Sequence, residues 1–62
     1  MMDEAGLTKL AREIMALGYD EETAFEYAAL IGDTPIMAED GRVVVYDGDQ
    51  ELARLNLRSL QS

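Results

Sequence analysis

Apolar residues recur at helical spacing near the start of the chain. Between residues 4 and 17 they fall at positions i, i+3, i+4 and i+7, which is typical of an amphipathic helix with one buried stripe. Asp3 stands where a side chain can cap this helix, and Gly18 stands where a residue in the left-handed conformation can end it. The pattern predicts a helix over about residues 4–17, with Tyr19 folded back towards it.

A second apolar stripe follows almost at once. It predicts a helix over about residues 21–31, with Glu21 and Glu22 in the first turn, where the helix dipole favours carboxylates. Gly32 is the expected end of this helix, and Pro35 excludes any continuation. Because the link between the two helices is so short, they should form an antiparallel or sharply crossed helical hairpin.

Beyond the proline the pattern changes to short apolar runs separated by Asp-Gly turns. The runs predict strands at about 36–38, 43–46 and 51–57, and the turns fall at residues 39–41 and 47–49. A helix is the alternative for the last segment, since some of its leucines also fit helical spacing. The strand is preferred because two such turns are spaced as in a β-meander.

The predicted fold is therefore α+β, in the order ααβββ. A helical hairpin would pack on one face of a small three-stranded antiparallel β-meander, and residues 1–62 would form a single domain. A chain of 62 residues buries a small core, and it has no cysteine for a disulfide to reinforce it.

Charge changes the picture more than any other property of the composition. The net charge is −8, and the segment from Glu13 to Glu51 holds eleven acidic residues against the single base Arg42. Such a field repels phosphates, so nucleic acid and anionic membranes are not expected as direct ligands, whereas basic partners are favoured. Solubility is the alternative explanation for the acidity.

Catalysis is not expected, because the chain has no histidine and no cysteine and its one lysine lies on a predicted solvent face. No cofactor and no metal are expected either. The acidic run from Asp47 to Glu51 fails the EF-hand pattern, which needs glycine and glutamate at positions that Leu52 and Arg58 would occupy. The acidic start of the chain and the lack of a long apolar run predict a cytoplasmic protein.

The candidate contact surface is acidic. Glu22, Glu26 and Asp33 share the outer face of the second predicted helix, and acidic residues in the two turns could continue this row. Two tyrosines are candidate anchors. The candidate partner-binding residues are Glu22, Glu26, Asp33, Glu39, Asp40, Asp47, Asp49, Tyr19 and Tyr46.

One stretch carries a motif. Residues 15–24, with Leu17, Gly18 and Tyr19 at the end of the first helix, resemble the start of a ubiquitin-associated domain, in which a loop of this kind contacts ubiquitin. That family forms three helices, whereas Pro35 and the valine-rich strand occupy the place of the third one here. The same residues also suit any helical hairpin.

In size, acidity and lack of catalytic residues, the whole chain resembles the anti-CRISPR proteins and other phage DNA mimics. This resemblance implies an inhibitor, encoded by a phage and active in the bacterial host cell, that occupies the basic groove of a nucleic-acid-binding protein or complex. The alternative is an antitoxin or regulatory adaptor that binds its partner through the edge of the sheet. A third possibility is a symmetric homo-oligomer that uses surplus apolar side chains such as Val44 and Leu52. The chain is expected to be a monomer or a small homo-oligomer.

Overall fold

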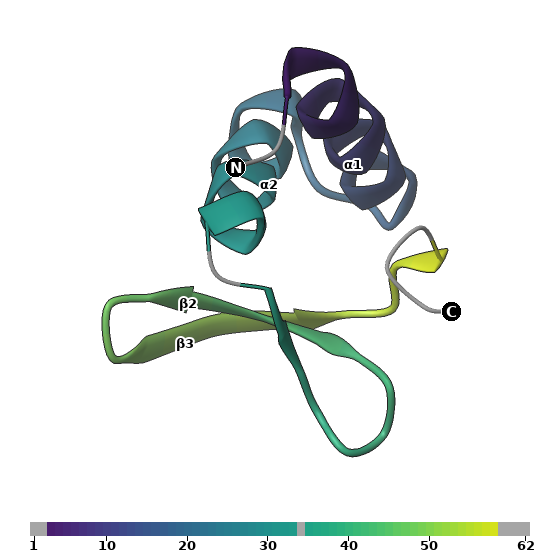
Figure 1. Cartoon of the computed structure of the whole chain (residues 1–62). Helices are drawn as coiled ribbons and strands as arrows, with labels where there is room; N and C mark the ends of the chain where they lie inside the picture. The colour runs from purple at the N-terminus through teal and green to yellow at the C-terminus, as the bar shows by residue number, and fades with distance from the viewer. Residues whose placement is uncertain (1–2, 34, 59–62) are drawn as a thin grey trace.

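The structure, a computed structural model, describes residues 3–33 and 35–58. Two helices precede three strands, and the antiparallel sheet has the order β1-β2-β3 (Figure 1). This confirms the predicted α+β fold, with the helical hairpin on one face of the sheet. In chain order the elements are α1 (Glu4–Ala16), α2 (Glu21–Asp33), β1 (Ile36–Met37), β2 (Val43–Asp47) and β3 (Gln50–Leu55).

Helix α1 has the predicted signals at both ends. The Asp3 carboxylate accepts a hydrogen bond from the Gly6 amide at 2.8 Å, which satisfies one of the free N–H groups of the first turn. At the other end Gly18 has a φ of 109°, a conformation that a side chain would strain. The helix ends at Ala16, one residue before the predicted end, because the Leu17 amide turns to the Ile14 carbonyl in a tighter turn.

Helix α2 runs further than predicted. Gly32 was expected to end it, but the helix continues through this residue to Asp33, and Gly32 does not adopt a positive φ. Glycine costs about 1 kcal/mol relative to alanine inside a helix, which is not enough to stop one that packs well. Pro35 is the stronger barrier, because it lacks an amide hydrogen and disfavours a helical residue before it.

The last segment is a strand, as preferred, and the helix alternative is wrong. Strand β3 begins one residue earlier and ends two residues earlier than predicted. It forms a hairpin with β2 around Gly48, whose φ of 64° suits a tight turn of this kind. Val45 pairs with Ala53 and Tyr46 pairs with Glu51, so Leu52 is the extra residue of a β-bulge in β3.

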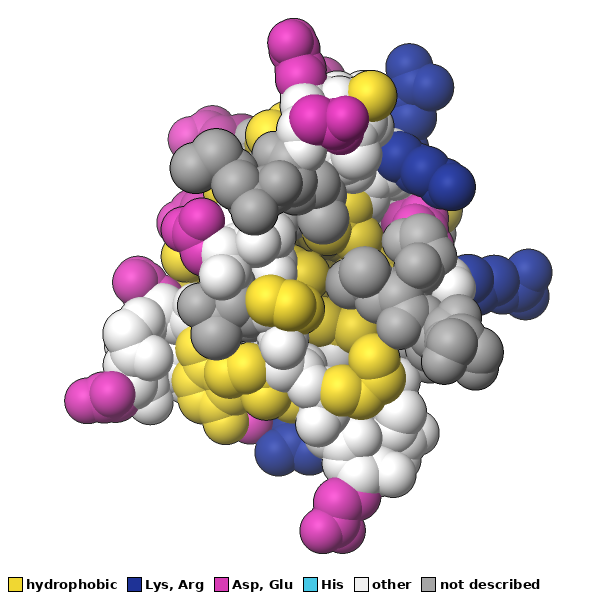
Figure 2. Space-filling view, in the orientation of Figure 1, with side chains coloured by type: hydrophobic (Ala, Val, Ile, Leu, Met, Phe, Trp, Pro, Cys, Tyr) yellow, Lys and Arg dark blue, Asp and Glu magenta, His cyan; other side chains and the backbone are white. Residues whose placement is uncertain are grey.

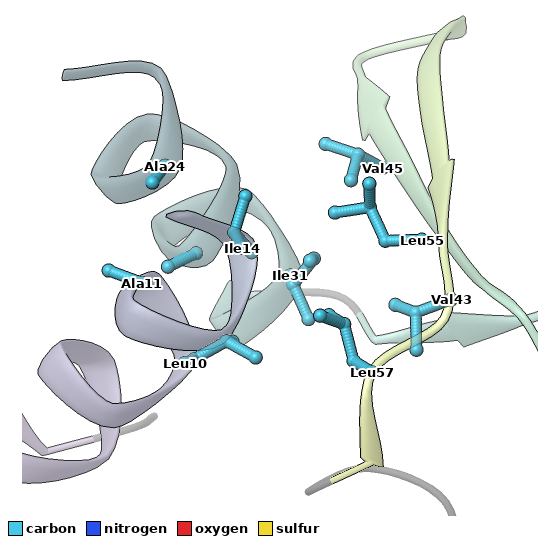
Figure 3. Close-up of a cluster of buried hydrophobic side chains, with 10 residues drawn as sticks. Leu10, Ala11, Ile14, Ala24, Ile31, Val43, Val45, Leu55 and Leu57 are labelled. Atoms are coloured by element: carbon cyan, nitrogen blue, oxygen red, sulfur yellow. The ribbon is translucent and has the colours of Figure 1, made fainter. Parts of the chain in front are cut away.

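The core lies between the helices and the sheet (Figure 3). Three alanines, Ala11, Ala24 and Ala28, are fully buried, which lets the backbones of α1 and α2 approach closely. Ile31 of α2 lies between the helical layer and the sheet. The other buried members of this cluster are Leu10, Ile14, Val43, Val45, Leu55 and Leu57.

Candidate protein-interaction surface

Every acidic residue of the predicted contact surface is exposed. Figure 2 shows acidic side chains along the α2 side of the molecule and at its projecting corners, whereas most lysine and arginine side chains gather on the α1 side. In this view most acidic side chains thus lie apart from the basic ones, with α2 on the acidic side and α1 on the basic side.

The helical part of this surface is a row on α2. Glu22, Glu26 and Asp33 are exposed and lie on the side of the helix away from the buried stripe of Ala24, Ala28 and Ile31. No basic residue occurs on α2. Within residues 3–33 and 35–58, none of these three carboxylates has an ion-pair partner, so their charge is not neutralised inside the chain.

The acidic residues of the two turns lie apart from this row. Glu39 and Asp40 belong to the turn between β1 and β2, which projects away from the helices in Figure 1. Asp47 and Asp49 flank Gly48 at the tip of the β2–β3 hairpin. The surface thus consists of three separate acidic groups, one on α2 and one at each turn.

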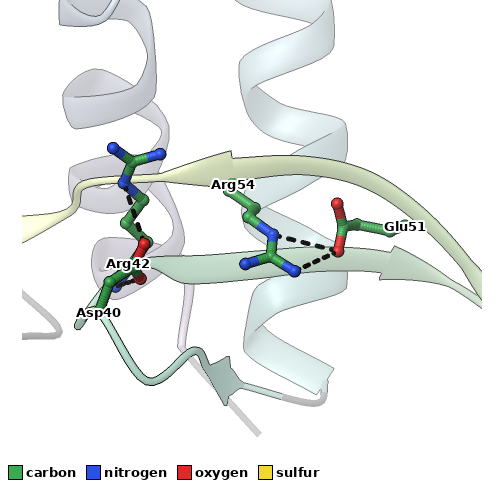
Figure 4. A network of polar contacts seen from close by, with 4 residues as sticks. All are labelled: Asp40, Arg42, Glu51 and Arg54. Carbon is green, nitrogen blue, oxygen red and sulfur yellow. Dashed lines mark hydrogen bonds and ion pairs between the residues drawn. The ribbon is translucent and has the colours of Figure 1, made fainter.

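Asp40 is the one predicted residue whose charge is compensated locally. Its Oδ1 accepts a hydrogen bond from the Arg42 amide at 3.0 Å, and its Oδ2 lies 3.5 Å from Arg42 Nε (Figure 4). The carboxylate therefore stabilises its own turn. Its neighbour Glu39 has no such contact with any described residue.

Arg54 is held in the same way on the sheet. Its Nε and Nη2 donate hydrogen bonds to Glu51 Oε1 at 3.2 and 3.1 Å (Figure 4). The hydrogen bond and the charge of Glu51 raise the pKa of the Arg54 guanidinium above its ordinary value. The two arginines on the sheet side are thus engaged by Asp40 and Glu51, and they do not offset the charge of α2.

The two tyrosines differ in their surroundings. Tyr19 is half-buried, packs against the core and makes an edge-to-face contact with Tyr27, at 5.5 Å between ring centroids. Its ring therefore already stabilises the helical hairpin. Tyr46 is half-buried on β2 and faces away from the helices, since its neighbour Val45 belongs to the core cluster.

The face of the sheet away from the helices carries a hollow that the sequence pattern did not reveal. We call it the outer hollow; its volume is about 540 Å³. Val44, one of the apolar residues suggested for self-association, faces this side but is only 3 % exposed, because Ile36 and Arg54 pair with it from both neighbouring strands. Three consecutive valines in the sequence indicate a strand that is covered on both faces, but they do not identify the residues that cover it. The residues that line the hollow include Ile36, Met37, Glu39, Asp40, Val44, Tyr46 and Arg54.

In the described ranges no group of three or more histidine, cysteine, aspartate or glutamate residues is arranged to hold a metal ion. Neither of the two helices is long and apolar enough to cross a membrane. Residues 15–24 comprise the end of α1, a short loop and the start of α2, and strands follow α2, unlike the three helices of a ubiquitin-associated domain. Comparisons of the chain with protein-family models, with curated proteins and with solved structures gave no match.

Proposed function

We propose that this protein is a small acidic inhibitor that occupies the basic groove of a nucleic-acid-binding protein and so excludes the nucleic acid, in the manner of phage DNA mimics and anti-CRISPR proteins. The uncompensated row of Glu22, Glu26 and Asp33 carries the proposal. One helical turn of four residues advances about 6 Å, comparable to the separation of successive phosphates in a nucleic-acid strand. Like charges at i, i+4 destabilise a helix, so the row has a cost that binding to a basic groove would offset.

The proposed mechanism is electrostatic. Exposed carboxylates on α2 and at both turns steer the chain towards a groove lined by lysine and arginine. Association is then fast and weakens as salt screens the charges. A few aromatic or apolar contacts fix the final position, since such residues supply most of the energy at protein interfaces.

The test is capture of partners from nuclease-treated host lysate on the immobilised chain, followed by stepwise elution with salt. We expect a basic nucleic-acid-binding protein that elutes early and that loses its nucleic acid when the chain is added. Glu22→Lys and Glu26→Lys should each weaken binding about tenfold. The matched control is Glu4→Lys, which makes the same charge change on exposed α1 and should leave the affinity within about twofold.

Two results would contradict this function. One is a captured partner that binds chain and nucleic acid together at full affinity. The other is an affinity that neither α2 substitution changes, since the row would then serve only solubility.

A second candidate function, an antitoxin or adaptor, uses the edge of the sheet. Strand β3 spans six residues and pairs on one side only with β2. Such an edge can accept a strand from a partner, although the bulge at Leu52 interrupts its regular donor spacing. Proline scanning of Gln50–Leu55 separates the two candidates: augmentation requires the backbone donors of this strand, whereas mimicry does not.

A further inference from the structure

The outer hollow is an apolar depression on a charged face. Three large apolar side chains are exposed in the described part of the chain, and two of them, Ile36 (37 %) and Met37 (50 %), form β1 and line the hollow. Ile36 pairs with Val44 and shares its face of the sheet, so together they form an apolar floor. Tyr46 stands on the same face of β2. The exposed apolar surface of this floor comes from Ile36, since Val44 is covered by its neighbours, and it is not needed for the core on the other side of the sheet.

The edge of the hollow is acidic. Glu39 and Asp40 line it from the β1–β2 turn, and Glu39 is exposed and has no ion-pair partner among the described residues. Of its lining residues only Arg54 is basic, and Glu51 already holds that side chain through two hydrogen bonds. The charge available to a ligand at this site is therefore negative.

Arg54 also shows what kind of group this surface accommodates. Its guanidinium is held by the Glu51 carboxylate through two hydrogen bonds. Arg54 is also the partner of Val44 in the neighbouring strand, so the two residues lie side by side on this face of the sheet. A cationic side chain beside an apolar residue, with its head on a carboxylate, is thus already present once within the chain.

We propose that the outer hollow receives a second cationic side chain, an arginine or lysine of the basic partner protein. The proposal rests on the proposed function, because it assigns an anchor point to the same partner. The stem of the incoming side chain packs on Ile36, which shares the outer face of the sheet with Val44. Its head hydrogen-bonds to Glu39. The α2 row steers the encounter, and the hollow anchors it.

Charge complementarity selects this occupant over the others. An anionic ligand would meet the uncompensated Glu39 carboxylate and, to use Arg54, would have to displace Glu51 from it. A second copy of this chain, with a net charge of −8, would be repelled as a whole. A purely apolar segment would offer the Glu39 carboxylate neither a hydrogen bond nor an opposite charge, so Glu39 would add nothing to its affinity.

The test uses short blocked peptides as probes and NMR of the full chain with labelled isoleucine, valine and tyrosine. The probe has one arginine between leucines, and its controls carry glutamate or the uncharged analogue citrulline in place of arginine. We expect saturable shifts of the Ile36 and Val44 methyl signals and of the Tyr46 ring with the arginine peptide alone, at millimolar concentrations. Glu39→Gln should weaken this binding about five- to tenfold, whereas Glu26→Gln should leave it unchanged.

Several outcomes would overturn the proposal. Equal binding of the glutamate or citrulline peptide would show an apolar or anion site, and shifts confined to α2 would place the contact elsewhere. An absence of saturable shifts would exclude the site. Ile36→Ser, at an exposed position, is a second variant that should also reduce binding while the folded spectrum is kept.

The same variants separate this proposal from the proposed function. If Glu26→Lys weakens binding of the captured partner while Glu39→Gln and Ile36→Ser do not, the anchor is wrong and the inhibitor function stands. If the arginine peptide binds in the hollow but the α2 substitutions do not change partner binding, the site stands and the groove mimicry fails.

Discussion

The two helices of this protein bury similar stripes of residues, but their solvent-exposed sides differ in charge. Each is thirteen residues long and buries three residues, with Leu10, Ala11 and Ile14 in α1 and Ala24, Ala28 and Ile31 in α2. Yet the solvent side of α1 mixes Lys9 and Arg12 with acidic residues, whereas α2 carries acidic residues alone.

This difference shows which features of the helices folding requires and which features it does not constrain. The buried stripes of both helices are explained by their packing on the sheet and on each other. This packing would be equally good if the solvent side of either helix carried both acidic and basic residues. Folding therefore does not account for the uncompensated charge of α2, which the proposed binding to a basic partner would explain.

The largest effect is expected in the core. Ile14→Ala and Ile31→Ala each remove a fully buried side chain, one from each helix, and each should lower the free energy of unfolding by about 2–5 kcal/mol. Urea unfolding followed by circular dichroism measures this. Because so small a domain has little stability to lose, Ile14→Val and Ile31→Val serve as milder variants, at about 0.5–1.5 kcal/mol. A large loss of unfolding free energy at one position and none at the other would show that the two helices do not contribute equally to the core.

A smaller effect is expected at the start of α1. Asp3→Ala removes the acceptor of the Gly6 amide and should cost about 1 kcal/mol in urea unfolding. Asp3→Asn keeps an acceptor without the charge, and it should retain most of the stability. Equal losses in both variants would mean that the charge of Asp3 near the helix dipole matters more than its hydrogen bond.

The smallest effect concerns the charge row itself. Glu26→Gln should raise the free energy of unfolding by a few tenths of a kcal/mol, because it relieves repulsion from Glu22 one turn away. The gain should disappear at high salt. Lys9→Gln on α1 is the control and should give no gain, since it adds to the negative charge of the molecule. A loss of stability in Glu26→Gln would show that the row contributes to folding, against the comparison drawn above.

Much of this architecture could be predicted from local signals. The helical periods, the Asp3 cap, Gly18 and the hairpin turn at Gly48 act over a few residues, so the order of elements follows from the pattern alone. Element ends were less certain where two local signals competed. At α2, packing of Ile31 outweighed the weak propensity of Gly32 to end a helix.

The interaction surface was harder to predict, since it depends on residues brought together by the fold. Exposure of Glu22 and Glu26 follows from helix periodicity, whereas Asp33 belongs to the same helix only because α2 continues past Gly32. The division of the acidic residues into three groups does not follow from periodicity, because it depends on where the turns project. The outer hollow needs the register that places Ile36 and Arg54 on either side of Val44, and no short stretch of sequence contains that information.

The arrangement of elements also bears on how fast the chain folds. Helix α1 packs on α2, β1 pairs with β2, and β2 pairs with β3, so most contacts join segments that follow one another in the chain. Short loops close at low entropic cost, and proteins rich in local contacts cross their folding barrier in microseconds to milliseconds. A newly synthesised chain would thus acquire its acidic surface almost as soon as it leaves the ribosome.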